Sequence, residues 1–236
     1  MPAATVHRPA PTPATMRLLQ FSLIAAVLGF AWLRFSDNTV DNDLWGHVLY
    51  GQRYVNQGHV RGPEPFSWTA GGFDIVNHEY LAEIVVGQVH RLAGGTGLWL
   101  YMVGMAVLTV TLALRFGRPR PTTFPWAGLL LLAGSVNFIA LGFAVRPQLF
   151  TTLFLVCELF VLRQLAAGRL AWGWLLPPLL ALWINLHGGV LAGWIVLAVM
   201  AGAGTLHALW PSALPVSWEA TRPARKNLSV SWLLLV

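Results

Sequence analysis

The stretch "RLLQFSLIAAVLGFAWLRFSDNTVDNDLWGH", residues 17–47, decides the fold class of this chain. It begins with an apolar run, Leu18 to Leu33, and continues to two carboxylates, Asp41 and Asp43, shortly after that run ends. A membrane-spanning helix needs roughly 20 mostly apolar residues. The run with its flanks meets that length and has no clear small-x-small cleavage site, so we interpret it as an uncleaved signal-anchor helix.

The composition of the whole chain indicates a membrane protein. Of its 236 residues, 56% are apolar and only 10% are charged, whereas soluble domains carry about 25% charged residues. The net charge is +6, but no basic stripe interleaved with aromatic residues accompanies it, so we expect no nucleic-acid partner. The single Cys157 excludes an intrachain disulfide framework.

Six segments are apolar enough to span a membrane, and the fifth contains Pro177-Pro178, which predicts a kink. The six lie at about residues 17–35, 97–115, 126–144, 147–165, 171–187 and 189–210. The sequence therefore predicts an all-α polytopic membrane protein surrounded by membrane lipid.

The other segments complete the domain organisation. Residues 1–16 are rich in Pro, Ala and Thr and predict a disordered tail before a transmembrane domain at 17–210. A basic cytoplasmic linker is expected at 211–227, and residues 228–236 read as the start of a further span. We therefore expect the chain to be the N-terminal part of a longer protein.

The basic residues predict how the spans are oriented. With the N-terminus in the cytoplasm, ten of the fifteen Lys and Arg residues fall in cytoplasmic segments, as the positive-inside rule requires. The loop at 36–96 then lies outside and holds seven of the nine acids. This pattern predicts a multi-pass membrane protein with its N-terminus in the cytoplasm.

The outer loop itself predicts two amphipathic helices along the membrane surface. One runs from Leu44 to Val55, and the other contains apolar residues from Leu81 to Leu92. Between them, two short β-prone runs around Ala70-Gly71-Gly72 predict a hairpin.

Several polar residues fall at the same outer face, although four separate connections supply them. They are Asp41, Asp43, His78, Glu79, Arg146, Asn185 and His187. Each also has a structural interpretation that remains open at this point. Asp43 could only cap a helix, as could His78-Glu79; Arg146 could anchor at the interface; and "NLHGG" could be a tight turn. Glu158, inside the fourth span, is left without a role.

Four segments carry a resemblance to a known superfamily. "DNDLWGHVLYGQRYVNQGHV", "PEPFSWTAGGFDIVNHEYLAE", "RPQLFT" and "LWINLHGG" resemble bacterial membrane proteins related to the GT-C glycosyltransferases. That superfamily includes protein O-mannosyltransferases, aminoarabinose transferases and oligosaccharyltransferases. The resemblance covers about residues 17 to 210 and implies a GT-C-like transmembrane bundle whose first outer loop carries an acid directly after the first span. Many relatives have a second acid next to it, whereas Leu44 stands there in this chain.

The resemblance implies sugar transfer from a polyprenyl-phosphate donor to an acceptor of unknown identity. Asp43 would be the catalytic base, at a helix start where the dipole favours its ionised form, with Asp41 as the alternative. Arg146 would bind the donor phosphate. His78, Glu79, Asn185 and His187 would line the substrate site, and Asp41, His78 and Glu79 would be the candidates to hold a divalent ion. A transporter or flippase for lipid-linked saccharide, or a non-catalytic membrane subunit, remains the alternative function.

Overall fold

The computed structural model shows a chain that is predominantly helical. It describes residues 12–36, 41–59, 61–116, 134, 136 and 144–210. Most of the expected third span at 126–144, and all of the segments expected at 211–227 and 228–236, lie outside these residues. Within the described part the regular elements are all helices, and no strand is present.

The described helices follow the order expected from the apolar runs. They are α1 (Pro13–Phe35), α2 (Leu44–Gln57), α3 (Tyr80–Phe116), α5 (Gln148–Ala166), a 3-10 helix η1 (Leu170–Leu175), α6 (Leu176–Ile184) and α7 (Val190–Leu209). Three of them, α1, α3 and α5, are long and apolar enough to cross a membrane. These helices indicate a membrane-embedded protein.

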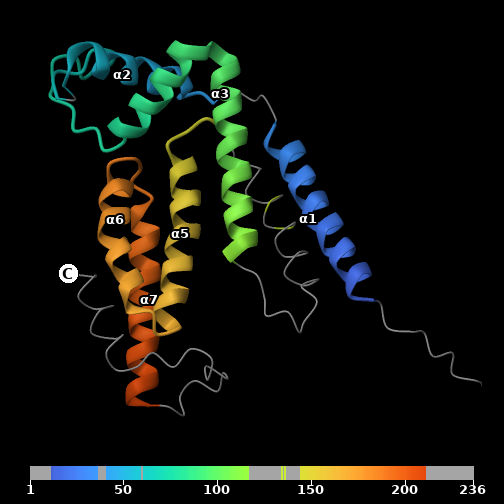
Figure 1. The fold of residues 1–236 in the computed structure, drawn as a ribbon. Coiled ribbons are helices and arrows are strands. Elements are labelled where there is room, and N and C mark those ends of the chain that lie inside the picture. Colours follow the sequence, from blue (N-terminus) through green and yellow to red (C-terminus); the bar gives the residue numbers. More distant parts are fainter. Residues whose placement is uncertain are drawn as a thin grey trace, which may run out of the picture.

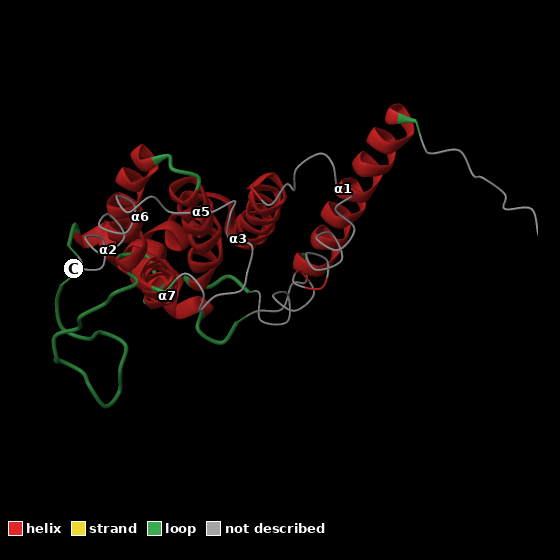
Figure 2. Cartoon of the chain, turned by 90° about the horizontal axis from the view of Figure 1, so that it is seen from below, coloured by secondary structure: helices red, strands yellow, loops and turns green. Residues whose placement is uncertain are grey.

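The long helices form a bundle with α2 lying across one of its ends, which we name the α2 end (Figure 1). The second half of α3 packs against α1 and α5, and α5 in turn packs against α6 and α7. Seen along the bundle, α1 stands outermost, on the far side of α3 from α5 (Figure 2). The chain therefore passes the α2 end at several points that are distant in sequence.

A break at Gly94 divides α3 into two segments. Gly94 has φ 59° and ψ −150°, a conformation that is almost exclusive to glycine. The first segment lies beside α2, and the second turns to run along the bundle (Figure 1). The surface helix and the span predicted separately from the sequence are thus two segments joined at this glycine.

The first segment of α3 crosses α2 with backbone against backbone. A Cβ atom on Gly87 would lie 2.8 Å from the backbone nitrogen of Gln52 and 2.9 Å from the carbonyl carbon of Gly51. A Cβ atom on Gly51 would overlap the carbonyl group of Glu83. The residues of this segment that are buried are Ala82, Glu83, Val86 and Gly87. The contact therefore combines apolar side chains with two glycines that allow close approach, and it buries the carboxylate of Glu83.

The predicted kink at Pro177-Pro178 is wrong. Both prolines lie in the first turn of α6, which starts at Leu176 after η1. The first residues of a helix donate no intrahelical hydrogen bond, so prolines there cost little. The expected span at 171–187 is consequently a 3-10 turn followed by a short helix.

The predicted hairpin reverses the chain without forming strands in the described residues. Pro63 and Asp74 make one isolated antiparallel bridge, and the Phe73 N–H donates to the Ala70 carbonyl at 3.1 Å. Pro63 and Pro65 have no N–H to donate, so a regular ladder cannot extend on that side.

Candidate functional site

The seven polar residues predicted to converge do lie at the α2 end, and contacts join six of them, all except Asn185, in two groups. Asp41, Asp43 and Arg146 form the first, which we call the arginine group. His78, Glu79 and His187 form the second, the Glu79 group.

In the arginine group, one guanidinium contacts two carboxylates. Arg146 Nε pairs with Asp41 Oδ2, and Arg146 Nη2 lies 3.5 Å from Asp43 Oδ2. Asp41 Oδ1 also accepts from the backbone N–H of Asp43 at 2.9 Å. The two acids are separated by one residue, and the turn at Asp41 brings both side chains onto Arg146.

The two acids differ in exposure and environment. The side chain of Asp41 is 11% exposed and that of Asp43 is 70% exposed. Burial raises the pKa of Asp41, but the hydrogen bonds from Arg146 and the Asp43 backbone outweigh it and hold that pKa below its usual value. Asp41 in turn raises the pKa of Arg146. Asp41 is thus the fixed partner of the arginine, and Asp43 is the accessible one.

Asp43 occupies the N-cap position of α2 without capping it through its side chain. Its backbone carbonyl accepts from the His47 N–H at 3.1 Å, but among the described residues its carboxylate makes no capping hydrogen bond. The interpretation of Asp43 as only a helix cap is therefore not supported. Its carboxylate remains open to a further ligand.

In the Glu79 group, two imidazoles face one carboxylate. Glu79 Oε1 lies 3.4 Å from His187 Nε2 and 3.7 Å from His78 Nε2. His78 is 65% exposed, whereas Glu79 and His187 are 20% and 24% exposed. His187 is thus the inner of the two imidazoles.

A hydrogen-bond chain fixes the tautomer of His187. The Trp183 indole N–H donates to Thr151 Oγ1 at 2.9 Å, and Thr151 Oγ1 lies 2.8 Å from His187 Nδ1. The Gly189 N–H also donates to Nδ1, at 2.9 Å. Because Nδ1 accepts these bonds, the proton of the neutral imidazole sits on Nε2, where it faces Glu79.

The electrostatic environment of His187 agrees with this neutral form. Burial lowers the pKa of His187, and His78 and His47 lower it further, against an opposing effect of Glu79. The neutral ring therefore directs its Nε2–H toward Glu79 Oε1, 3.4 Å away.

Asn185 has a positioning role between α6 and α3. Its Oδ1 accepts from the Tyr80 hydroxyl at 3.0 Å, and its backbone carbonyl accepts from the Leu81 N–H at 3.3 Å. These bonds hold the start of α3 against the turn between α6 and α7. They thereby place Glu79 opposite His187.

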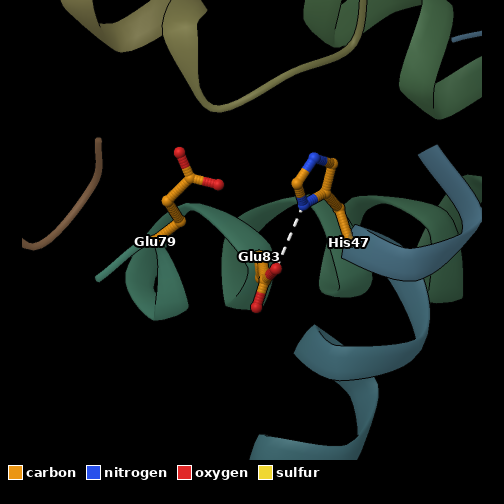
Figure 3. A group of neighbouring side chains, drawn as sticks. All are labelled: His47, Glu79 and Glu83. Carbon is orange, nitrogen blue, oxygen red and sulfur yellow. Dashed lines mark hydrogen bonds and ion pairs between the residues drawn. The ribbon is translucent and has the colours of Figure 1, made fainter. Parts of the chain in front are cut away.

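Three residues of the site were missed from the sequence: His47, Asn77 and Glu83. His47 Nδ1 lies 3.0 Å from Glu83 Oε1 (Figure 3). Glu83 Oε2 accepts from Asn77 Nδ2 at 2.6 Å. Glu83 is 4% exposed. Burial lowers the pKa of His47, but Glu83, then Glu79 and Asp43, outweigh it and raise that pKa above its usual value.

A spacing of four residues could have revealed His47 and Glu83. His47 lies four positions before Gly51, and Glu83 four positions before Gly87. Residues four apart share one face of a helix. The two glycines that allow the helices to touch therefore also place these side chains opposite each other.

One group of side chains within the described residues has the geometry of a metal site. Ligand atoms of His47, Glu79 and Glu83 all lie within 4.8 Å of one another. The ring of His47 and the carboxylate of Glu79 extend to the same side of α3 (Figure 3). Of the three residues expected to hold an ion, Glu79 belongs to this group, and Asp41 and His78 do not.

Comparison with family models, with curated proteins and with solved structures found no match for this chain.

Proposed function

We propose that the chain is a membrane glycosyltransferase of the GT-C type, which moves a sugar from a polyprenyl-phosphate donor to an acceptor at the outer face of the membrane. The observation that carries this proposal is the arginine group, in which an exposed carboxylate and a guanidinium lie side by side. A polyprenyl tail stays in the bilayer while its phosphate stays at the interface. The α2 end offers both charges that the reactive bond of such a donor needs.

The contacts within the arginine group suggest how the roles divide. Asp41 makes the closer contact with Arg146, and Asp43 makes a longer one at 3.5 Å. A phosphate that takes Nη2 of Arg146 would release Asp43 while Asp41 still holds the guanidinium in place. Asp43 would then accept the proton of the acceptor nucleophile as that nucleophile bonds to the sugar C1. The bond from C1 to the phosphate oxygen breaks, and the phosphate leaves with the electron pair, stabilised by Arg146.

The Glu79 group would shape the acceptor side of the site. His78 is its most exposed member and would contact the acceptor directly. His187 would hold Glu79, and Asn185 would keep the start of α3 in register with the α6–α7 turn.

The test compares Asp43→Asn with Asp41→Asn in the complete protein, with sugar transfer from a polyprenyl-phosphate donor as the readout. Asparagine keeps the shape of aspartate but cannot take up the proton. We expect Asp43→Asn to abolish transfer while donor binding persists, and Asp41→Asn to weaken donor binding through Arg146. Asp74→Asn, in the loop between α2 and α3, is the matched control. Transfer at the parental rate in Asp43→Asn would refute the proposed base.

The proposal requires the α2 end to face outward from a bacterial inner membrane, with the N-terminus in the cytoplasm. Gly71 and Ala167 are both exposed and lie at opposite ends of the bundle. In intact cells, an impermeant thiol reagent should label Gly71→Cys and not Ala167→Cys. The reverse pattern would contradict the orientation.

Glu158 supports a second candidate function, that of a transporter or flippase for lipid-linked saccharide. It lies near the middle of α5, is fully buried, and within the described part of the chain neither carboxylate oxygen has a hydrogen-bond partner. Transporters place polar groups at this depth. Movement of a fluorescent lipid-linked saccharide across vesicles that is lost in Glu158→Gln, without sugar transfer, would favour this alternative.

A further inference from the structure

We infer that His47, Glu79 and Glu83 form a binding site for one divalent transition-metal ion of the zinc type. One imidazole and two carboxylates are a donor set that suits Zn²⁺, with a fourth position left for water or substrate. This inference concerns ion binding alone and stands whether or not the chain transfers sugar.

The fold brings the three donors together by a rigid contact. His47 and Glu83 each lie one turn before a glycine of the α2–α3 crossing, and their side chains are 3.0 Å apart. Glu79 lies one further turn before Glu83 and completes the group within 4.8 Å. Donor atoms around a tetrahedral Zn²⁺ with bonds of about 2.0–2.1 Å are about 3.3 Å apart. Glu79 therefore needs only a rotation of its partly exposed side chain to reach the ion.

Each carboxylate of the site is oriented by a group outside it. Asn77 Nδ2 donates to Glu83 Oε2, which leaves Oε1 directed at His47. His187 Nε2 faces Glu79 Oε1, and Thr151 and Gly189 hold that imidazole in place. Metal sites commonly orient their ligands through such contacts from outside the ligand set.

The charge around the site also favours a cation. Arg146 is paired with Asp41 and Asp43. Among the ion pairs of the described residues, Glu79 and Glu83 contact histidines and no permanently charged cation. Two carboxylates close together and partly desolvated repel each other unless a cation lies between them. A divalent ion replaces the proton that now joins His47 to Glu83 and screens Glu79 as well.

The imidazole distinguishes among ions. Mg²⁺ and Ca²⁺ prefer oxygen ligands only, whereas Zn²⁺ accepts nitrogen and oxygen and binds such sites more tightly than Mn²⁺. We therefore expect Zn²⁺ to bind at one ion per chain, Mn²⁺ more weakly, and excess Mg²⁺ to leave the bound Zn²⁺ in place.

The experiment measures Zn²⁺ alone on the purified complete protein, without a histidine tag and freed of metal by a chelator, using equilibrium dialysis. His47→Gln and Glu83→Gln should each lower the affinity at least tenfold. Two matched controls should leave it unchanged: His90→Gln, an imidazole outside the group that bonds to Gln52, and Glu64→Gln, a carboxylate held by Tyr50. Absence of stoichiometric Zn²⁺, or equal affinity in His47→Gln and the His90→Gln control, overturns the site.

X-ray absorption of the Zn²⁺-loaded parental protein tests the same site without any variant that could misfold. We expect one imidazole and otherwise oxygen donors around the ion. Two or more imidazoles would place the ion on His78 and His187 instead and would overturn the assignment.

Discussion

Replacing Gly87 with alanine should push α2 away from α3. The new Cβ atom would lie 2.8 Å from the Gln52 nitrogen and 2.9 Å from the Gly51 carbonyl carbon, where ordinary van der Waals contact begins at 3.4 Å. Both neighbours are backbone atoms and cannot rotate away, so the helices must separate by about 0.6 Å. Overpacking of this kind costs about 1–3 kcal/mol, and we take about 2 kcal/mol for a backbone contact.

Alanine also favours a helix over glycine by about 1 kcal/mol, so Gly87→Ala should lose about 1 kcal/mol of unfolding free energy in total. Gly46→Ala is the matched control, because a Cβ atom on Gly46 meets nothing within 4 Å. Gly46→Ala gains the helix propensity of alanine without a clash, so its free energy of unfolding should rise by up to about 1 kcal/mol.

Denaturant unfolding of both variants in mixed micelles isolates the packing term as their difference, about 2 kcal/mol. Because α2 carries His47, Gly87→Ala should also weaken Zn²⁺ binding, and Gly46→Ala should not. Equal stability of the two variants would refute a backbone-to-backbone crossing.

Gly189→Ala should lower the free energy of unfolding and detach His187 from Thr151, since its Cβ atom would lie 2.6 Å from His187 Nδ1. Gly202→Ala is the control, because a Cβ atom there meets nothing within 4 Å. Histidine NMR reports the tautomer of His187 in each variant. Asp41 has a lowered pKa, so its contribution to stability is complete above its ordinary value of 3.8 and is lost as pH falls through the lowered value. In Asp41→Asn the free energy of unfolding should therefore depend less steeply on pH below that value. An unchanged pH dependence in this acidic range would contradict the reasoning. Arg146→Gln should lower the free energy of unfolding by about 1–3 kcal/mol because it leaves Asp41 unpaired. In a double-mutant cycle, the double variant with Asp41→Asn should recover most of that loss.

Apolar runs in the sequence were sufficient to predict where most described helices lie. The helix expected from Leu44 is α2, and the spans expected at 147–165 and 189–210 correspond to α5 and α7. Hydrophobic segments of that length leave few alternatives to a helix in a membrane. The same topology correctly predicted that residues from four connections meet at the α2 end.

The contacts inside the site could not be predicted in the same way, because they depend on small residues and on side-chain direction. Gly51 and Gly87 carry no hydrophobic signal, yet they set the α2–α3 crossing and bury Glu83. Thr151 looks like an ordinary residue of an apolar span, and only its contact with His187 reveals its role. The direction of the Asp41 side chain depends on a local turn, which the spacing of residues in the sequence does not specify.

The contact between Tyr80 and Asn185 has a consequence for the synthesis of the protein. These two residues are 105 positions apart, so at about 5–20 residues per second the ribosome needs about 5–20 s to complete the pair. During that interval Glu79 has emerged without His187, and the start of α3 lacks its bonds to the turn between α6 and α7. A chaperone or insertase that shields charged surface loops would act in this window, and a chain released before the α6–α7 turn would expose an acidic, half-assembled site to quality-control proteases.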